Sequence, residues 1–512
     1  MTFPKNRSFI RIVSLAALCC ATSLSARAED ATFVQGENPY YKSNKAQLDK
    51  VLAQAPNVKQ AKNVILFVGD GYGVATMTAA RIFEGQSRGV DGPSNKLAHE
   101  SFPYSAISRT YAHDSLVTDS APSAVAMTTG VKSNNNMLGL SGDAVWKDCE
   151  KSKGKDVTTI GEIAKSIGMS VGAVSTARIT DATPAAVYAH SAHRSWENDA
   201  VLGDQAKAGC TDIASQLVSF KYGDGLDVMF GGGRQNFLPE TMADPEYTDK
   251  KGMRKDGRDL TAEWLKRYSN SGAYAWNQEG FDKIDPKTVT HALALFERDN
   301  MQFEADRAKD KGGEPALADM ATKAIDILSQ NKEGYFLMVE GGRIDHGSHN
   351  NNAYRTLTDA VAMDKALKAV LAKVNLEETL VIVTADHDHT LTITGYPDRD
   401  TNILGLVKER GKVALADDGK PYTVIGYGNG PGGKKDGAPR ADLSAVDVTD
   451  PDFVQQALIP LSSETHAGQD VAIYAAGPWA HLFQGIVDEN YTFLVMDYAL
   501  KANERLAAHS KK

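Results

Sequence analysis

The sequence predicts an α/β protein whose mainly parallel central β-sheet is flanked by helices on both faces. Short, continuous apolar runs mark the expected strands, and patterns typical of helices lie between them. The expected strands cover residues 64–68, 171–174, 228–230, 336–339, 380–383 and 471–474, and the clearest helices cover 160–166, 317–328 and 357–374. Alternation of buried strands with helices is typical of helical crossovers, which make the sheet parallel.

The N-terminus has the pattern of a secretory signal peptide. Lys5, Arg7 and Arg11 precede an apolar stretch at 14–24, and the small-x-small motif Ala26-Arg27-Ala28 follows it. We expect cleavage after Ala28, so that residues 1–28 are removed and the mature protein is exported, either to the periplasm or into the medium.

A membrane anchor and a lipoprotein are the alternative interpretations of this terminus. A stretch of about 11 apolar residues is well short of the ~20 that span a bilayer. Lipid attachment at Cys19 or Cys20 is less favoured, because Leu18 and Cys19 are poor residues before a lipidated cysteine. We therefore expect no transmembrane anchor, and the polar end of the chain predicts no lipid anchor there.

Beyond residue 28, we expect a short N-terminal segment and one large domain. Residues 29–60 look irregular apart from a short helix near 46–53, and residues 61–512 carry the strand and helix pattern of the main fold. Residues 238–315 are polar with helical patterns, and residues 395–463 are rich in Gly, Asp and Lys. Both segments are interpreted as insertions, the second on the rim of the sheet.

The chain is acidic, with a formal net charge of −9 at pH 7. Removing residues 1–28 takes away four basic residues and no acidic ones, which makes the mature protein more acidic still. Such a protein is a poor general binder of nucleic acid. An anionic substrate would need a local source of positive charge, and bound metal ions are the clearest candidate.

Two cysteines, Cys149 and Cys210, remain after removal of the signal peptide. In an oxidising compartment two lone cysteines usually pair, and a bond between them would close a loop of about 60 residues. Two free, buried thiols are the alternative.

Three of the predicted strands lead into acidic residues: Asp70, Glu340 and Asp386. Ligands bind at the carboxyl ends of the strands in an open parallel sheet, so these side chains should meet in one crevice. Carboxylates held together repel one another, and a divalent cation removes that repulsion. A single acid at such a place is more often a helix cap, but three together favour a metal site.

Histidines extend this pattern. Asp345 and His349 are four residues apart, which places them on one helical face. Asp386-His387-Asp388-His389 follows a strand directly, and His466 lies near the C-terminus. Imidazole and carboxylate are ligands for catalytic zinc, and oxygen ligands suit magnesium. We assign no site role to His99, His113, His291, His190 or His193, the last two being interpreted as packing residues near Arg194.

Ser120 is the candidate nucleophile. Pro122 fits the first turn of a helix that ends near Gly130, so Ser120 would lie at a helix N-terminus, where backbone N–H groups favour an anion. Without the acids and histidines it would be a simple helix cap. Gly85-Gln86-Ser87-Arg88-Gly89 matches a serine hydrolase motif but lacks the strand before the serine and the helix after it.

Together these residues resemble the alkaline phosphatase family. The matching motifs follow the family's order and span almost the whole mature chain. They are Gly69-Asp70-Gly71-Tyr72-Gly73, Asp119-Ser120-Ala121, Val339-Glu340-Gly341-Gly342-Arg343-Ile344-Asp345-His346-Gly347-Ser348-His349, Thr384-Ala385-Asp386-His387-Asp388-His389 and Glu464-Thr465-His466-Ala467-Gly468. The resemblance implies an alkaline phosphatase core, two zinc ions, one magnesium ion, phosphate monoesters as substrates and a homodimer.

The resemblance also implies roles for individual residues. The first zinc would be bound by Asp345, His349 and His466. The second would be bound by Asp70, Asp386 and His387. The magnesium would be bound by Asp70, Thr183 and Glu340. Arg194 would hold two phosphate oxygens with its planar fork of donors.

Three auxiliary positions, Asp181, His346 and His389, would lie near the metals. Asp181 matches a common bacterial choice and His346 an animal-like choice, so the resemblance leaves the pH optimum, the turnover and the metal in the third site open. The Cys149–Cys210 spacing resembles the animal-type disulfide, and residues 395–463 would form the crown region.

The favoured reaction is hydrolysis of phosphate monoesters through a phosphoserine at Ser120. A sulfatase or phosphodiesterase on a related metal core is the nearest alternative. Sulfatases use a modified Cys in a C-x-P-S-R setting, which this chain lacks, and diesterases tend to lack a partner like Arg194. A phosphate or metal scavenger, which would need no nucleophile, is the non-enzymatic alternative.

Overall fold

The computed structural model describes residues 34–435 and 437–509, and the predicted signal peptide at 1–28 lies outside these ranges. The chain divides into two compact units, residues 1–54 and residues 55–512. The candidate site lies wholly in the second unit.

The first unit contains a 3-10 helix, η1 (Val34–Glu37), and helix α1 (Pro39–Leu52). The Asn38 side chain accepts a hydrogen bond from the backbone N–H of Tyr40, and Pro39 occupies the first helical position. These start signals explain why the helix begins seven residues before the predicted 46–53, so the expectation that residues 39–45 are irregular was wrong.

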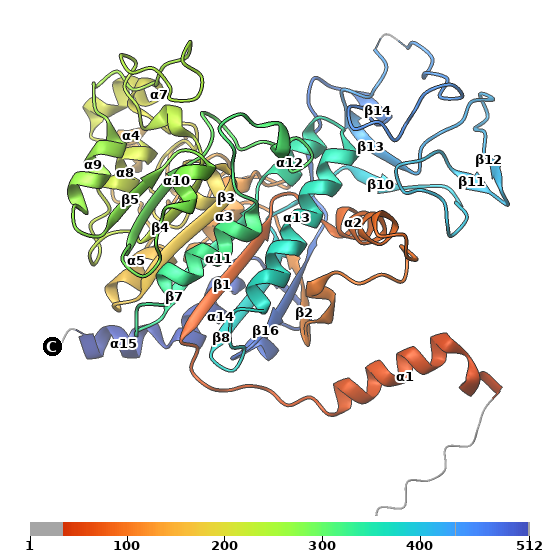
Figure 1. Cartoon of the computed structure of the whole chain (residues 1–512), viewed down its shortest axis with the longest axis horizontal. Helices are drawn as coiled ribbons and strands as arrows, with labels where there is room; N and C mark the ends of the chain where they lie inside the picture. The colour runs from red at the N-terminus through yellow and green to blue at the C-terminus, as the bar shows by residue number, and fades with distance from the viewer. Residues whose placement is uncertain (1–33, 436, 510–512) are drawn as a thin grey trace, which may run out of the picture. The chain divides into compact units, whose positions relative to one another are not determined.

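A ten-stranded sheet in the order β17-β2-β16-β8-β1-β7-β3-β4-β6-β5 forms the centre of the second unit (Figure 1). The strands from β8 to β5 in this order are parallel, whereas β16 runs antiparallel to both β8 and β2. The predicted strands are β1 (Asn63–Gly69), β3 (Ser170–Arg178), β4 (Val228–Gly232), β7 (Tyr335–Gly341), β8 (Thr379–Ala385) and β16 (Val471–Ala476). The others are β2 (Tyr104–Arg109), β5 (Gly272–Ala275), β6 (His291–Leu295) and β17 (Ile486–Asp488). The predicted fold class is confirmed.

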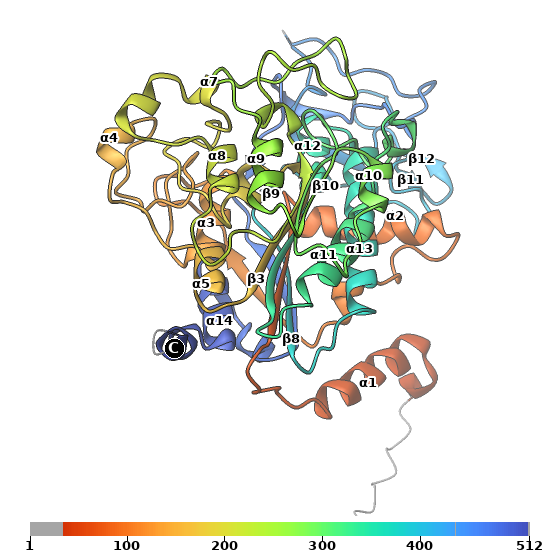
Figure 2. The same ribbon diagram turned by 60° about the vertical axis from the view of Figure 1, so that its left-hand side comes forward.

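Helices cover both faces of the sheet (Figure 2). In β1, Ile65 and Phe67 face one core, and Leu66 and Val68 face the other. Burial of each such side chain stabilises the fold by about 1.5–3 kcal/mol. The first core is completed by α2 (Val74–Ser87), α11 (Leu317–Leu328) and α13 (Ala353–Leu371). The second is completed by α3 (Ser120–Thr129), α5 (Ile160–Ser166), α8 (Ile213–Val218) and α14 (Tyr491–Leu500).

Two of the predicted helices, α5 and α11, have the expected bounds, and α13 begins earlier than expected. The Asn352 side chain accepts a hydrogen bond from the backbone N–H of Arg355 and so starts α13 at Ala353 rather than at residue 357.

The segment 238–315 is more than the helical, polar insertion that its sequence indicates. It contains α9 (Leu260–Arg267) and α10 (Gln278–Asp282), but it also supplies β5 and β6, which extend the parallel sheet beyond β4. The segment 395–463 lies outside that sheet. It contains a hairpin of β11 (Lys408–Glu409) and β12 (Lys412–Val413), and its β13 (Ile425–Gly430) and β14 (Ala457–Pro460) form a small sheet with β10 (Leu391–Ile393).

Cys149 and Cys210 form a disulfide, as predicted. Cys149 begins the short helix α4 (Cys149–Ser152), and Cys210 follows the 3-10 helix η3 (Gly203–Ala208). Among the residues that the structure describes, no helix combines the length and apolar character needed to cross a bilayer.

Candidate active site

Strand pairing brings the three predicted strand-end acids to one edge of the sheet. β1 lies between β7 and β8, with Val68 opposite Glu340 and Gly69 opposite Ala385. Asp70 and Asp386 each follow the last residue of their strand, and Glu340 is the penultimate residue of β7. All three are buried, so their charges are poorly screened by solvent.

Ser120 is the first residue of α3, and the Asp119 side chain caps this helix by accepting a hydrogen bond from the N–H of Ala121. Ser120 is only 3% exposed. Its Oγ lies 3.4 Å from Oδ1 of Asp70 and 3.1 Å from Nε2 of His387. The hydroxyl therefore lies at a helix N-terminus and directly against the acid and histidine cluster.

The first predicted zinc set is brought together. Asp345 and His349 lie one turn apart on α12 (Arg343–His349), and His349 Nε2 is 3.2 Å from Asp345 Oδ1. The short strand β15 (His466–Ala467) pairs with β9 (Asp388–His389) and so positions His466. Nε2 of His466 lies 3.3 Å from Asp345 Oδ1 and 3.2 Å from His349 Nε2.

The second predicted zinc set also converges. The ligand atoms of Asp70, Asp386 and His387 all lie within 4.8 Å of one another. His387 Nε2 is 3.2 Å from Asp70 Oδ1 and 3.4 Å from Asp386 Oδ2. Asp386 Oδ1 accepts a hydrogen bond from the backbone N–H of Gly71, but its Oδ2 has no hydrogen-bond partner among the described residues.

Glu340 and Thr183, the residues expected to join Asp70 at the magnesium, are both 1% exposed. Thr183 lies on the short helix α6 (Ala182–Ala185), and the Ser175 hydroxyl donates to Glu340 Oε2. Burial raises the pKa of Glu340 to about 8, and Asp181 adds to the effect. Burial also raises the pKa of Asp70, as do the charges of Asp386 and Asp345.

His389, predicted as auxiliary, lies inside the cluster rather than beside it. Its Nε2 is 2.9 Å from Asp345 Oδ1, and Asp345, His387, His389 and His466 can all present ligand atoms within 4.8 Å of one another. Its Nδ1 donates to Glu464 Oε2. Glu464 is 1% exposed and its backbone carbonyl accepts from His349 Nδ1, so it orients two histidines at once.

Arg194 is held by two carboxylates. Its Nη1 donates to Asp119 Oδ1 at 3.0 Å and its Nη2 donates to Asp181 Oδ1 at 2.7 Å. Burial by itself would raise the pKa of Asp181, but the charges of Arg178 and Arg194 hold this pKa well below its usual range. Burial lowers the pKa of His346 to about 4, so this second auxiliary side chain is neutral at pH 7.

Three residues that hold site side chains in place were not predicted from the sequence: Asp119, Glu464 and Arg178. Asp119 and Glu464 stand inside the quoted motifs, so their position beside Ser120 and His466 was the available signal. The hydrolase-like motif around Ser87 lies at the end of α2, where the Ser87 hydroxyl donates to the Glu84 carbonyl. The motif follows a helix and not the strand that a serine hydrolase motif requires, so Ser87 is not placed as a nucleophile.

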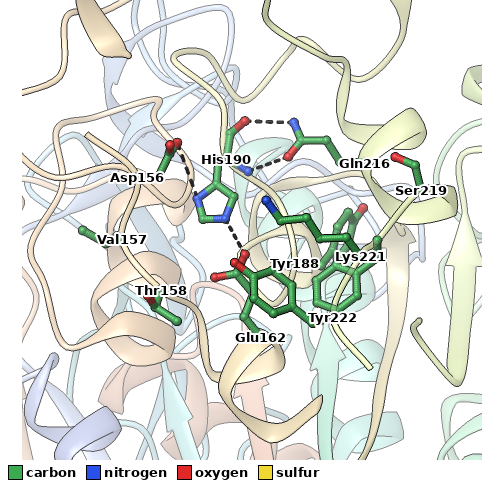
Figure 3. A pocket seen from close by; sticks show the side chains of 11 residues that line it. Asp156, Val157, Thr158, Glu162, Tyr188, His190, Gln216, Ser219, Lys221 and Tyr222 are labelled. Carbon is green, nitrogen blue, oxygen red and sulfur yellow. Dashed lines mark hydrogen bonds and ion pairs between the residues drawn. The ribbon is translucent and has the colours of Figure 1, made fainter. Parts of the chain in front are cut away.

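The histidines without a predicted role have structural contacts. His190 bonds to the Gly139 carbonyl and to Glu162, and Figure 3 shows it between Glu162, Asp156 and Gln216 in a surface pocket. His193 packs between Trp146 and Trp196. Two further groups, distinct from the cluster at Ser120, have potential ligand atoms within 4.8 Å of one another: Asp224, Asp227 and His291, and Glu246, Glu297 and Asp310.

A buried serine among clustered carboxylates and histidines, at the carboxyl edge of a parallel sheet, defines a metal-dependent hydrolase. The model of the alkaline phosphatase family matches residues 61–502. The alkaline phosphatase of Gadus morhua is 42% identical over 458 residues, which cover 88% of this chain and 94% of the relative. The human tissue-nonspecific isozyme is 43% identical over 454 residues, covering 87% of this chain and 85% of that protein.

Solved alkaline phosphatases share the fold. The enzyme from Thermus thermophilus superposes with a TM-score of 0.63 at 23% identity, covering 90% of this chain and 97% of that chain. A His-to-Asp mutant of the alkaline phosphatase from the Antarctic bacterium TAB5, with Mg bound in its M3 site, gives a TM-score of 0.60 at 24% identity over 87% of this chain and 99% of that chain. The chain belongs to the alkaline phosphatase family, and it is a metal-dependent phosphoric monoester hydrolase.

Proposed function

We propose that this chain hydrolyses phosphate monoesters in two displacements through a phosphoserine at Ser120, with two zinc ions and one magnesium ion in each subunit. The observation that carries this proposal is the position of the Ser120 hydroxyl, 3.1 Å from His387 and 3.4 Å from Asp70, at the start of α3. A serine held against ligands of that kind is suited to attack on phosphorus.

The donor chemistry supports the predicted metal sets. Buried carboxylates that raise one another's pKa favour a compensating cation, and Asp386 Oδ2 and His387 Nδ1 have no hydrogen-bond partner among the described residues. The zinc ions would be held by Asp345, His349 and His466 and by Asp70, Asp386 and His387. Magnesium would be held by Asp70, Thr183 and Glu340. When bound, these ions supply the positive charge that favours the Ser120 alkoxide and neutralises the attacking and leaving oxygens.

The residues of the chain perform the remaining tasks. Arg194 binds two non-bridging phosphate oxygens, and the helix dipole of α3 favours the same anion at its N-terminus. Ser120 Oγ bonds to phosphorus as the bond to the ester oxygen breaks, and the alcohol leaves. Water then attacks the phosphoserine, which releases inorganic phosphate and restores the Ser120 hydroxyl.

A Ser120→Ala variant tests the nucleophile. We expect it to retain its zinc and magnesium, measured by elemental analysis, and to form no acid-stable phosphoprotein with labelled substrate. Ser87→Ala, in the motif without catalytic geometry, is the matched control and should behave like the wild type. Labelled phosphoserine trapped in Ser120→Ala would refute the assignment.

Substrate comparison separates the alternatives. A monoester has three non-bridging oxygens, two for Arg194 and one for the proposed metal ions, whereas a diester has only two. We therefore expect p-nitrophenyl phosphate to be hydrolysed far faster than bis(p-nitrophenyl) phosphate. Faster hydrolysis of the diester would indicate a phosphodiesterase, and tight phosphate binding without turnover would indicate a scavenger.

We further propose export and a homodimeric state. The Cys149–Cys210 disulfide supports an oxidising compartment such as the periplasm or the medium. N-terminal sequencing of the exported protein should begin near Glu29, and light scattering should give twice the subunit mass. A monomer, or an uncleaved N-terminus, would contradict the corresponding part.

A further inference from the structure

Arg178, the last residue of β3, is tied to three carboxylates. Its Nε donates to Glu197 Oε1 at 3.1 Å and Oε2 at 2.9 Å, and its Nη1 donates to Asp299 Oδ1 at 3.0 Å. Its Nη2 donates to Asp181 Oδ2 at 2.8 Å. The side chain is 20% exposed, and each of its three guanidinium nitrogens donates to a carboxylate, which fixes its orientation.

Asp181 links this arginine to Arg194. One carboxylate oxygen, Oδ2, accepts from Arg178, and the other, Oδ1, accepts from Arg194 and from the backbone N–H of Ala182. The carboxylate thus cannot rotate without breaking a charge-assisted hydrogen bond on one side or the other.

The other two residues whose carboxylates bind Arg178, Glu197 and Asp299, are themselves held by further hydrogen bonds. Glu197 accepts from Thr180 Oγ1 and from Asn236 Nδ2, and Asn236 is 2% exposed. Asp299 follows β6 and accepts from Arg178 through its side chain, while its backbone carbonyl accepts from Gly233. Arg178 is therefore held by groups on several neighbouring segments.

The hydrogen-bond inventory of Arg194 shows what this arrangement provides. Each terminal nitrogen of a guanidinium carries two N–H groups. Nη1 of Arg194 uses one on Asp119 and Nη2 uses one on Asp181, which leaves one N–H on each nitrogen for a phosphate oxygen. If Asp181 turned, the planar guanidinium would be free to turn with it, and its two remaining donors would no longer point toward the phosphate.

We propose that Arg178 is a positioning residue for Arg194, acting through Asp181 to hold the guanidinium in the orientation that binds phosphate. This inference rests on the proposed role of Arg194 in phosphate binding. Arg178 itself contacts no substrate. It sets the direction of two N–H groups that do.

A double-mutant cycle tests the proposal. Arg178→Met should raise the inhibition constant of inorganic phosphate and lower kcat/KM by about tenfold, the cost of about one charge-assisted hydrogen bond. In an Arg194→Ala background the same substitution should change either quantity less than about twofold, because no guanidinium remains to be positioned. Arg178→Lys, which keeps the charge but loses the fork, should fall between wild type and Arg178→Met.

Controls separate positioning from general loss of structure. Arg258→Met removes an arginine that pairs with Glu263, none of whose contacts is with a site residue, and it should leave phosphate inhibition unchanged. Thermal unfolding of every variant shows whether it is folded, and Arg178→Lys supplies the measurement if Arg178→Met does not fold.

Each outcome has one meaning. Equal losses from Arg178→Met with and without Arg194 would make the effect structural and overturn the proposal, as would no loss in either. If Arg194→Ala alone left phosphate inhibition unchanged, the proposed role of Arg194 would fail first, independently of Arg178.

Discussion

The Nδ1 of His389 and the Oε2 of Glu464 lie 2.6 Å apart, and both side chains are completely buried. The remaining oxygen of Glu464, Oε1, accepts from the backbone N–H and the hydroxyl of Thr390. Glu464 is thus fully engaged and fixes which nitrogen of His389 faces Asp345.

Glu464→Gln should weaken zinc binding by about tenfold. An amide is a poorer acceptor for His389 Nδ1 and loosens the imidazole, whose Nε2 lies 2.9 Å from Oδ1 of the proposed zinc ligand Asp345. Competition with a chromogenic chelator measures the affinity. Glu263→Gln, which removes a carboxylate paired with Arg258 elsewhere, is the control. Unchanged affinity in Glu464→Gln would show that His389 and Asp345 are oriented by other contacts.

Metal binding to the metal-free protein should release protons at pH 7. Burial raises the pKa of Glu340 to about 8, so its carboxyl is mostly protonated there when no cation is bound, and the pKa of Asp70 is raised as well. Titration calorimetry in two buffers of different ionisation enthalpy should give a positive number of released protons, and this number should fall at pH 9. No release at pH 7 would contradict the raised pKa values of these buried carboxyls.

Removal of the disulfide should lower the free energy of unfolding. The bond joins residues 61 apart, for which the chain-entropy relation gives about 4 kcal/mol. Cys149→Ala, Cys210→Ala and the double variant should lose similar amounts, since each breaks the same bond. Denaturant unfolding measures the loss, and additive losses would show that side-chain packing, rather than the bond, is responsible.

The stability contributed by the His190–Glu162 pair should depend on pH. Burial by itself would lower the pKa of His190 and raise the pKa of Glu162. The hydrogen bond between the two side chains outweighs burial, so that the pKa of His190 lies above its ordinary 6.5 and the pKa of Glu162 lies below its ordinary 4.5. The stability contributed by His190 is fully present below pH 6.5, the pKa of the unfolded state, and is lost as the pH rises through the pKa of the folded state. The glutamate contribution is present above 4.5 and is lost as the pH falls.

Glu162→Gln should therefore lower the melting temperature most between pH 5 and about 6.5, and progressively less as the pH rises through the raised pKa of His190. Glu279→Gln, which removes an exposed pair with Lys283, should have little effect at any pH. A loss from Glu162→Gln that does not vary with pH would assign its role to packing alone.

Much of the fold could be predicted because its strands are long apolar runs. Val64 to Val68 are fully buried between two helical layers, and a segment buried on both faces must be continuously apolar. The strands that were missed are short or lie toward the edges. β5 and β6 lie in a segment whose helical and polar pattern obscured them. One pairing partner of β6 is β4, where Val228 pairs with Ala292, 64 residues further along the chain.

The candidate site likewise has residues that the sequence could place and residues that it could not. Asp70, Glu340 and Asp386 could be placed together because parallel strands end at one edge, and Asp345 and His349 because four residues make about one helical turn. Asp119 and Glu464 stood inside the recognised motifs but were assigned no role. A local pattern shows that a side chain is polar, but it does not show which partner that side chain contacts.

By itself the sequence determined the parallel sheet, the position of Ser120 at a helix start and the group of acids and histidines at the strand ends, because these depend on periodicity and on the direction of strands. Only the tertiary structure decided that Asp181 lies between Arg178 and Arg194, that Glu464 orients His389 and that β6 lies beside β4. A hydrogen bond forms only when its donor and acceptor atoms lie about 3 Å apart. Its partners are therefore chosen by how distant segments pack, which no local spacing in the sequence encodes.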